Sequence, residues 1–295
     1  MAANEAEPQR LLSVQSHVAS GYVGNRSATF PLQLLGWDVD VINTVQFSNH
    51  TGYGRFRGSR FDEAHIRSLF SGLEENGLLK QSRLLSGYMP SPGVVHALRD
   101  AVERIRGVNP GLVYLCDPVM GDMGRGMYVD PNVLPAYRAV LPLASIVTPN
   151  QFEAQVLAER EIRDLPSLLE VLARIHDQGV EHVIITSVEL PKEDLERMGV
   201  ARRARLMDGE TEVGSMVCVG SSRPTRASAE DTPLRPWFIE FPEIPGYFSG
   251  VGDLFAALTL GRYDEAQAGE VTPIARAAEL AIASVQGVLA RTTAA

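Results

Sequence analysis

Short apolar runs alternate with segments of helical periodicity along most of the chain. The apolar runs predict strands at residues 11–15, 39–45, 83–86, 112–116, 145–148 and 183–186. The segments between and after them predict helices at residues 26–35, 61–73, about 93–105, around 168–175, and from Thr272 and Pro273 onward. This β-α-β alternation indicates an α/β fold, a three-layer sandwich in which helices cover both faces of a mostly parallel sheet.

The segment at residues 207–245 departs from this alternation. Its pattern turns to short strands and to a polar stretch at residues 221–233 that is rich in Ser, Pro and Arg. We expect this stretch to be a long loop or flap rather than a linker between domains. Residues 1–9 are polar and acidic and predict a disordered lead. Residues 10–295 are therefore expected to form a single domain.

The composition narrows the classes of function. The 295 residues carry a formal net charge of −9, which argues against a nucleic-acid surface because such a surface needs a basic stripe. No apolar run approaches the roughly 20 residues of a membrane-spanning helix, and the N-terminus lacks the apolar core of a secretory signal. The two cysteines, Cys116 and Cys218, form neither a disulfide framework nor a zinc site. We expect a protein of the cytoplasm, with the nucleus as an alternative compartment, and no membrane partner.

Lysine is rare, and its positions exclude two classes of kinase. Lys80 and Lys192 are the only lysines among 27 basic residues, and neither follows a glycine. The phosphate-binding loop G-x-x-x-x-G-K-[ST] is therefore absent, which excludes a P-loop NTPase. The V-A-I-K and H-R-D patterns of protein kinases are absent as well.

Ligands of parallel α/β sheets bind beyond the carboxyl ends of the strands, so the residues there are the candidates. Ser16 follows the first predicted strand, where a turn or cap serine is the simpler interpretation. Residues 21–26 form a glycine-punctuated loop before a helix. Residues 46–54 combine hydrogen-bonding and aromatic side chains, which suits a flat polar ligand, although an ordinary loop has the same composition.

Acidic side chains follow two later strands. Asp117 and Asp122 come after the strand at 112–116, where they either cap turns or hold Mg²⁺ against phosphates. Asn150 and Glu153 match a capping box, and Glu153 is also a candidate to order water around Mg²⁺.

Residues 248–257 carry the most information. Gly250 and Gly252 lead into an apolar helix whose free amides suit an anion or a transferring phosphoryl group. Asp253 is then placed to act as a general base toward a substrate hydroxyl. An N-cap aspartate is the alternative, but it does not account for the two glycines before it.

Together these segments resemble the ribokinase-like superfamily, whose signature joins Gly-x-Gly-Asp to Asn-x-x-Glu. They are most similar to the eukaryotic pyridoxal kinases, over about residues 11–288. Seven motifs in the same order carry this resemblance, at residues 13–18, 21–26, 45–53, 116–119, 148–154, 183–187 and 252–257. The resemblance implies ATP-dependent phosphorylation of the 5′-hydroxymethyl group of pyridoxal, pyridoxine or pyridoxamine, which is vitamin B6 salvage. It also implies Mg²⁺ bound as MgATP, a monovalent cation such as K⁺, a homodimer, and no separate lid domain.

The resemblance further implies a role for individual residues. Asp253 would be the base, Gly250, Val251 and Gly252 would offer amides to the phosphoryl group, and Ser16 would hydrogen-bond the pyridine ring. The other residues implied to contact the substrate are Val23, Val45, Phe47, His50, Thr51, Tyr88 and Tyr128. The residues implied to serve the nucleotide or its metals are Asp117, Asp122, Thr148, Asn150, Glu153, Thr186, Ser187 and Val251. Residues 121–127 are the expected cover of the site.

Two departures from the family pattern stand out. Val251 occupies a position where many eukaryotic members carry threonine, which removes one hydroxyl contact to the nucleotide or phosphate. Bacterial relatives also carry valine there. The cover between Asp122 and Tyr128 is shorter than in animal enzymes, which bears on gating and affinity.

Three other functions compete with this interpretation. Ser16 and residues 47–53 speak against a hydroxymethylpyrimidine kinase of the same superfamily. An intact Asp253 speaks against a non-catalytic vitamin-binding protein, because a binding protein needs no base at a phosphate site. An enzyme that uses pyridoxal phosphate as cofactor needs a Schiff-base lysine, and Lys80 and Lys192 lie outside every motif.

Overall fold

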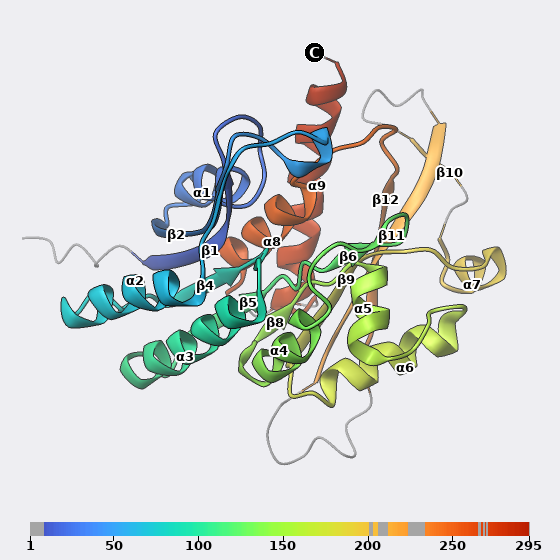
Figure 1. The fold of residues 1–295 in the computed structure, drawn as a ribbon. Coiled ribbons are helices and arrows are strands. Elements are labelled where there is room, and N and C mark those ends of the chain that lie inside the picture. Colours follow the sequence, from blue (N-terminus) through green and yellow to red (C-terminus); the bar gives the residue numbers. More distant parts are fainter. Residues whose placement is uncertain are drawn as a thin grey trace, which may run out of the picture.

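The computed structural model describes residues 9–200, 203–205, 212–223, 234–264, 267, 269 and 271–294, and Figure 1 shows their arrangement around a central sheet. The strands of this sheet are β1 (Arg10–Val18), β2 (Asp38–Phe47), β3 (Gly58–Arg60), β4 (Arg83–Ser86), β5 (Val113–Cys116), β8 (Ile146–Val147), β9 (His182–Val188), β10 (Arg203–Arg205), β11 (Glu212–Ser222) and β12 (Trp237–Pro242). A separate two-stranded hairpin consists of β6 (Gly121–Asp122) and β7 (Gly126–Met127).

The centre of the sheet is parallel and its two edges are antiparallel. Six strands pair in parallel in the order β2-β1-β4-β5-β8-β9. At one edge β3 runs antiparallel to β2, and at the other β11 runs antiparallel to β9, β10 and β12. The chain steps from β1 to β2 on one side and then crosses to β4 on the other. Such a reversal opens a crevice at the carboxyl ends of the strands, where ligands of these sheets bind.

Helices cover both faces of the sheet, as the alternation predicted (Figure 1). One face carries α2 (Glu63–Glu75), α3 (Pro92–Val108), α4 (Val133–Val140), α5 (Gln151–Ala158) and α6 (Leu165–His176). The other face carries α1 (Asn25–Leu34), α8 (Val251–Arg262) and α9 (Pro273–Thr293). The shorter elements are α7 (Lys192–Arg197) and the 3-10 turns η1 (Thr51–Tyr53) and η2 (Leu141–Leu143).

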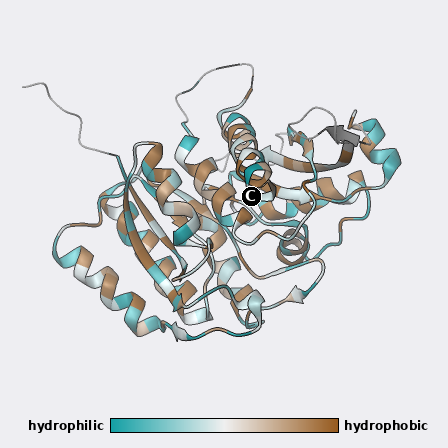
Figure 2. Ribbon diagram, turned by 90° about the horizontal axis from the view of Figure 1, so that it is seen from above, coloured by the Kyte–Doolittle hydropathy of each residue, from teal (hydrophilic) through white to brown (hydrophobic). Residues whose placement is uncertain are grey.

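Two hydrophobic cores hold these layers together, because successive side chains of a strand point to opposite faces. In β5, Tyr114 and Cys116 join the core under α2–α6, whereas Val113 and Leu115 join the core under α1, α8 and α9. All four side chains of β5 are buried, as expected of a parallel strand covered on both faces. In Figure 2 the helices show brown faces toward the strands and teal faces away from them.

The predicted strands and helices are present with shifted ends, and β1 is the informative exception. It continues through Ser16 to Val18, so Ser16 lies inside the strand rather than after it. The pairing register of β1 with β2 shifts between Gln15 and Ser16. The extra residue of this bulge is Thr44 in β2, so the irregularity lies in β2 and β1 continues without an insertion. Residues 46 and 47 end β2 instead of following it.

The prediction for residues 207–245 was wrong in part. Residues 221 and 222 were expected in a loop, but they end β11, an 11-residue strand between β9 and β12. Pairing on both sides stabilises a strand whose serine and glycine residues have low intrinsic strand propensity. The rest of the predicted flap, residues 224–233, lies outside the described residues, as does the predicted lead apart from Gln9. Helix α4 was missed altogether.

Candidate active site

Four carboxylates converge at the carboxyl ends of the central strands. They come from the end of β5, from the β6–β7 hairpin, from α5 and from α8, and they are Asp117, Asp122, Glu153 and Asp253. All four act on Tyr128, which is 52% exposed: partial burial first, and then Glu153, Asp117, Asp122 and Asp253, raise its pKa. The structure therefore brings together acidic residues that are up to 136 positions apart in the chain, and it places Tyr128 among them.

Burial and mutual repulsion raise the pKa values of three of these carboxyl groups. Burial is the main cause for Asp117, and Glu153 and Asp253 add to it. Burial also raises the pKa of Glu153 to about 7, against the opposing effect of three backbone N–H groups. Asp253 is raised by burial and lowered by a hydrogen bond from Gly24. Such a cluster of like charges favours the binding of a cation.

Asn150 and Glu153 form the predicted capping box at the start of α5, which confirms that interpretation. The same two side chains also hold the β6–β7 hairpin. Glu153 Oε1 accepts from the backbone N–H of Met120 at 2.8 Å and of Gly121 at 3.4 Å, and Asn150 Nδ2 donates to the Gly121 carbonyl at 2.7 Å. Glu153 is 3% exposed, and both of its carboxylate oxygens accept hydrogen bonds from backbone amides. Its structural effect is therefore to fix the root of the hairpin.

The start of α8 has the geometry of an anion site. Gly250 precedes the helix with φ 78°, and a Cβ there would lie 2.0 Å from the carbonyl oxygen of Tyr22, so only glycine fits. No side chain caps this helix end. Gly252 is exposed, and a Cβ at this position would lie 3.9 Å from Asp117 Oδ2. The free amides of the first turn therefore open beside the acidic cluster.

Asp253 is the third residue of α8 and not its N-cap, so the capping alternative for this residue is wrong. Its Oδ2 accepts a hydrogen bond from the backbone N–H of Gly24 at 2.8 Å. Gly24 in turn packs tightly on Ser16, because a Cβ on Gly24 would lie 2.4 Å from Ser16 Oγ. A second link joins Ser27 Oγ to the carbonyl of Gly250 at 3.0 Å. The glycine loop thus connects Asp253 to Ser16.

The predicted apolar ring contacts also gather in one place. Val23, Val45 and Phe47 form a small buried cluster with Val18, and Tyr88 packs against it. His50 is partly buried at the start of η1, and its Nδ1 accepts from Gly52 N–H at 3.3 Å. Thr51 is exposed in the same turn. A cavity of about 460 Å³ adjoins this turn and is lined by residues 48, 49 and 54–57.

Thr148 directly follows β8, and Thr186 lies in the neighbouring strand β9. Thr148 is 3% exposed, its backbone N–H donates to Cys116 at 3.1 Å, and its buried Oγ1 has no hydrogen-bond partner in the described part of the chain. Thr186 N–H donates to the Pro149 carbonyl at 3.0 Å, and Ser187 follows it in β9. These residues follow Asp117 along the edge of the sheet toward β9, and their contact with a nucleotide stays a prediction.

The arrangement fits a hydrated Mg²⁺ that is shared with a nucleotide. In the described residues no group of three or more His, Cys, Asp or Glu side chains is arranged to hold a metal ion by itself. Mg²⁺ in phosphoryl-transfer sites takes one or two carboxylates, several waters and substrate phosphates, so a group of three such protein ligands is not required. Asp117 has no ion-pair partner in the described residues, and Thr148 Oγ1 is an unpartnered buried oxygen nearby. This donor set consists of oxygens, which Mg²⁺ prefers.

Sequence reasoning missed a buried polar network under the ring contacts. Gln15 Nε2 donates to Ser13 Oγ at 2.9 Å, and Ser13 Oγ donates to Asn25 Oδ1 at 2.7 Å. Asn25 Nδ2 donates in turn to Asn43 Oδ1 at 2.8 Å and to the carbonyl of Ile42. The network ties β1, β2 and α1 together. The signal in the sequence was a polar residue at every second position of an otherwise apolar strand.

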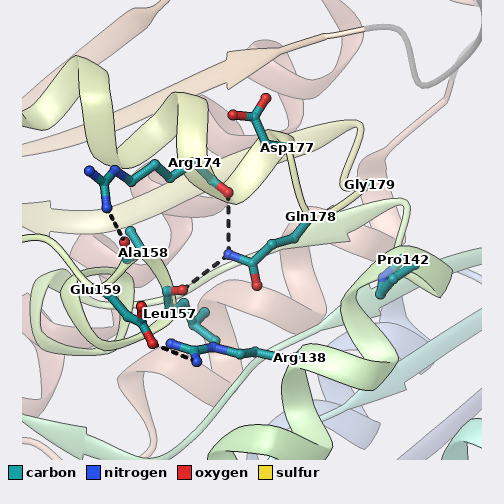
Figure 3. A pocket seen from close by; sticks show the side chains of 9 residues that line it. All are labelled: Arg138, Pro142, Leu157, Ala158, Glu159, Arg174, Asp177, Gln178 and Gly179. Carbon is teal, nitrogen blue, oxygen red and sulfur yellow. Dashed lines mark hydrogen bonds and ion pairs between the residues drawn. The ribbon is translucent and has the colours of Figure 1, made fainter.

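A cavity of about 700 Å³ lies apart from this site (Figure 3). It is lined by the ends of α4, α5 and α6, at Arg138, Pro142, Leu157, Ala158, Glu159, Arg174, Asp177, Gln178 and Gly179. None of the four carboxylates described above lines it. Its charged side chains are paired, Arg138 with Glu159 at 2.7 Å, Arg174 with Glu170, and Asp177 with Arg223. This cavity and the acidic cluster are therefore two separate places in the fold.

Comparison with known proteins identifies the family. A pyridoxal kinase of Arabidopsis thaliana is 40% identical over 289 residues, which cover 96% of this chain and 82% of the relative. The chain belongs to the pyridoxal kinase family. The human pyridoxal kinase is also 40% identical, over 86% of this chain and 77% of its own length. Pyridoxal kinase from Leishmania donovani, solved with ADP and pyridoxamine, superimposes with a TM-score of 0.81 at 33% identity, covering 96% of this chain and 90% of that chain.

A family model described as phosphomethylpyrimidine kinase matches residues 87–210. This part of the chain contains Asp117, Asp122, Asn150 and Glu153, but neither Ser16 nor Asp253. The shared segment thus concerns the acidic and hairpin side of the site. The pyridoxal kinases match over both sides. In the described residues no helix has the length and apolar character needed to cross a membrane.

Proposed function

We propose that this protein transfers the γ-phosphoryl group of ATP to the 5′-hydroxymethyl group of pyridoxal, pyridoxine and pyridoxamine. Membership of the pyridoxal kinase family supports the reaction, and relatives solved with ADP and either pyridoxamine or pyridoxine support both substrates. The observation that carries the proposal is the start of α8. There, uncapped amides, a partly buried Asp253 and the carboxylate of Asp117 meet at one point.

Asp253 is the general base in this proposal. Its Oδ2 is held by the Gly24 N–H, which leaves the other oxygen to accept the proton of the substrate hydroxyl. Burial raises the pKa of Asp253, and a carboxylate with a raised pKa is a stronger base. The hydroxyl oxygen then attacks the γ-phosphorus as the bond to ADP breaks.

The amides of Val251 and Gly252, with Gly250 shaping the turn, bind the transferring phosphoryl oxygens. Asp117, Asp122 and Thr148 hold Mg²⁺ together with the phosphates of ATP. When bound, Mg²⁺ neutralises the charge that develops on those phosphates. Asn150 and Glu153 keep the hairpin in place and order water beside the metal, while Thr186 and Ser187 contact the nucleotide.

The vitamer occupies the opposite side of Asp253. Val23, Val45, Phe47 and Tyr88 wall the ring, as their shared cluster supports. Ser16 donates or accepts a hydrogen bond at the ring edge, and Gly24 connects it to the base. His50 and Thr51 close the pocket from the turn after β2, and Tyr128 covers it from the hairpin side.

The test is purified protein with MgATP and pyridoxal, with the product followed by its absorbance, beside Asp253→Asn. The asparagine keeps the shape and still accepts the Gly24 N–H, but it cannot take a proton. We expect kcat to fall by roughly 10²–10⁴-fold with little change in nucleotide affinity. Near-normal turnover of the variant would remove Asp253 as the base. Phosphorylation of hydroxymethylpyrimidine in preference to pyridoxal would move the assignment to the related pyrimidine kinases.

Two further parts of the proposal concern ions and assembly. A monovalent cation, K⁺, supports activity, and replacing it by tetramethylammonium in the same assay tests this.

A homodimer forms in solution. Its support is the helical face of α1 on which Phe30 and Leu34 are 65% and 71% exposed. Sedimentation of the wild type beside a Phe30→Ser, Leu34→Ser variant measures that assembly.

A further inference from the structure

The tip of the β6–β7 hairpin carries a positively charged side chain, Arg125, whose backbone is held by Asp122 of the acidic cluster. Asp122 Oδ1 accepts the backbone N–H of Gly124 at 3.0 Å and of Arg125 at 2.8 Å. The root of the same hairpin is held by Glu153 and Asn150. Arg125 is therefore the outermost part of a hairpin that is fixed at its base by residues of the proposed phosphate site.

Arg125 reaches a residue from a distant part of the chain. Its guanidinium carbon lies 5.0 Å from the centre of the Tyr247 ring, and its Nη1 donates to Tyr247 Oη at 3.4 Å. The ion pairs found in the described residues do not include Arg125, so the ring is its main partner there. Tyr247 is 67% exposed and lies three positions before Gly250, the residue that opens the phosphoryl-binding turn.

The same pair meets the vitamer-side turn after β2. Tyr247 Oη lies 3.6 Å from the position of a Cβ on Gly52, which is ordinary contact distance. The charge of Arg125 also acts on His50 at the start of this turn, where it and burial lower the pKa of the imidazole. Three segments that are far apart in sequence, residues 50–54, 121–127 and 246–250, therefore meet through Arg125 and Tyr247.

We propose that Arg125 and Tyr247 form a clasp that joins the phosphate-side hairpin to the vitamer-side turn and holds both substrates in register for transfer. Arg125 is a positioning residue and does not touch the reacting atoms. This inference rests on the proposed function and assigns two residues that the sequence analysis did not single out. A cation on an exposed aromatic ring is a weak contact, which suits a clasp that must open for each turnover.

Loss of the clasp has a chemical consequence. An open hairpin admits water to the γ-phosphorus, and the phosphoryl group then passes to water instead of the hydroxymethyl group. In that side reaction the water oxygen bonds to phosphorus, the bond to ADP breaks, and the water proton goes to solvent. The products are ADP and inorganic phosphate, so the ratio of ADP to phosphorylated vitamer measures how well the clasp holds.

The experiment compares Arg125→Ala, Tyr247→Ala and the double variant with wild type. We expect each single variant to raise the KM for pyridoxal by roughly two- to five-fold and to raise the ADP-to-product ratio, with kcat little changed. The double variant should be no worse than either single one, because each removes the same contact. Tyr247→Phe keeps the ring and should stay close to wild type. Arg163→Ala, at an exposed arginine paired with Glu161, is the matched control.

Additive effects of Arg125→Ala and Tyr247→Ala, or an unchanged KM and ADP ratio in both, would overturn the clasp. A second readout is independent of turnover: hydrogen exchange of the amides at residues 121–127 in protein without substrates. Faster exchange in Arg125→Ala than in Arg163→Ala supports the clasp, and equal exchange contradicts it. A wild type without kinase activity would defeat the proposed function, while the exchange result would still decide the clasp.

Discussion

The two sides of the site are built differently. On the phosphate side Asp117, Thr148 and Glu153 are 6%, 3% and 3% exposed, and Glu153 is bonded to three backbone amides. On the vitamer side the turn at residues 51–54 is exposed, and Tyr53 is 80% exposed. Transition-state charge is best stabilised by dipoles that are already fixed, whereas a substrate must enter and leave. The comparison sets a buried, hydrogen-bonded proposed phosphate side against an exposed turn on the proposed vitamer side.

After Asp253→Asn, the largest effect is expected at Gly250, where the two proposed sides join. Gly250→Ala forces a methyl group into the Tyr22 carbonyl at a backbone φ that favours glycine. The 21–24 loop must move away from Asp253, and misplacement of this size costs about 10²-fold in kcat/KM. Steady-state kinetics measure it. Gly287→Ala in α9, where nothing lies within 4 Å, is the control and should leave activity unchanged. Equal activity of the two variants would show that catalysis does not depend on the backbone conformation at Gly250.

A smaller effect tests the rigidity of the phosphate side. Both oxygens of Glu153 can accept from backbone N–H groups even when the carboxyl group is protonated, whereas Glu153→Gln puts an NH2 group that only donates in place of one of them. We therefore expect the variant to destabilise the fold by about 1–3 kcal/mol at low pH. Urea denaturation in metal-free buffer measures this, with the exposed Glu75→Gln as control. A variant as stable as wild type would mean that the hairpin root does not depend on this carboxylate.

The same variant carries a pH signature. The folded pKa of Glu153 is about 7, above its ordinary value of 4.5. Between these values the folded protein keeps a proton that the unfolded chain releases, so the contribution of Glu153 is present below pH 4.5 and is lost as pH rises through about 7. The stability of wild type relative to Glu153→Gln should therefore fall between pH 5 and pH 8, by about a few kcal/mol at most. Parallel stability curves for the two proteins would contradict this.

The smallest effect concerns the vitamer side alone. Ser16→Ala would remove the hydrogen bond proposed to the ring, and we expect the KM for pyridoxal to rise roughly two- to ten-fold while the KM for MgATP stays constant. Kinetics with each substrate varied in turn give both constants, and the exposed Ser68→Ala is the control. If both constants change together, the two sides are coupled more tightly than the structure indicates.

The sequence predicted those features that depend on neighbours along the chain. The capping box of Asn150 and Glu153 spans three residues, and the buried strand β9 is a run of β-branched residues, so both could be inferred locally. The resemblance supplied the list of site residues, whose roles stay a prediction; the structure places Val23, Val45 and Phe47 in one buried cluster with Tyr88 against it. Pairing between distant segments could not be inferred. Arg125 and Tyr247 are 122 positions apart, and β11 is a strand because β9 and β12 flank it.

The bulge between Gln15 and Ser16 has one more consequence. Successive side chains of a strand point to opposite faces, so every second residue lies on the same face. The extra residue is Thr44 of β2, which lies between the partners of Gln15 and Ser16. It resets this alternation in β2, so that Ile42 and Thr44 are buried at even positions and Val45 and Phe47 at odd positions. Strict alternation through Thr44 would turn Val45 and Phe47 to the other face of the strand, away from their cluster with Val18 and Val23.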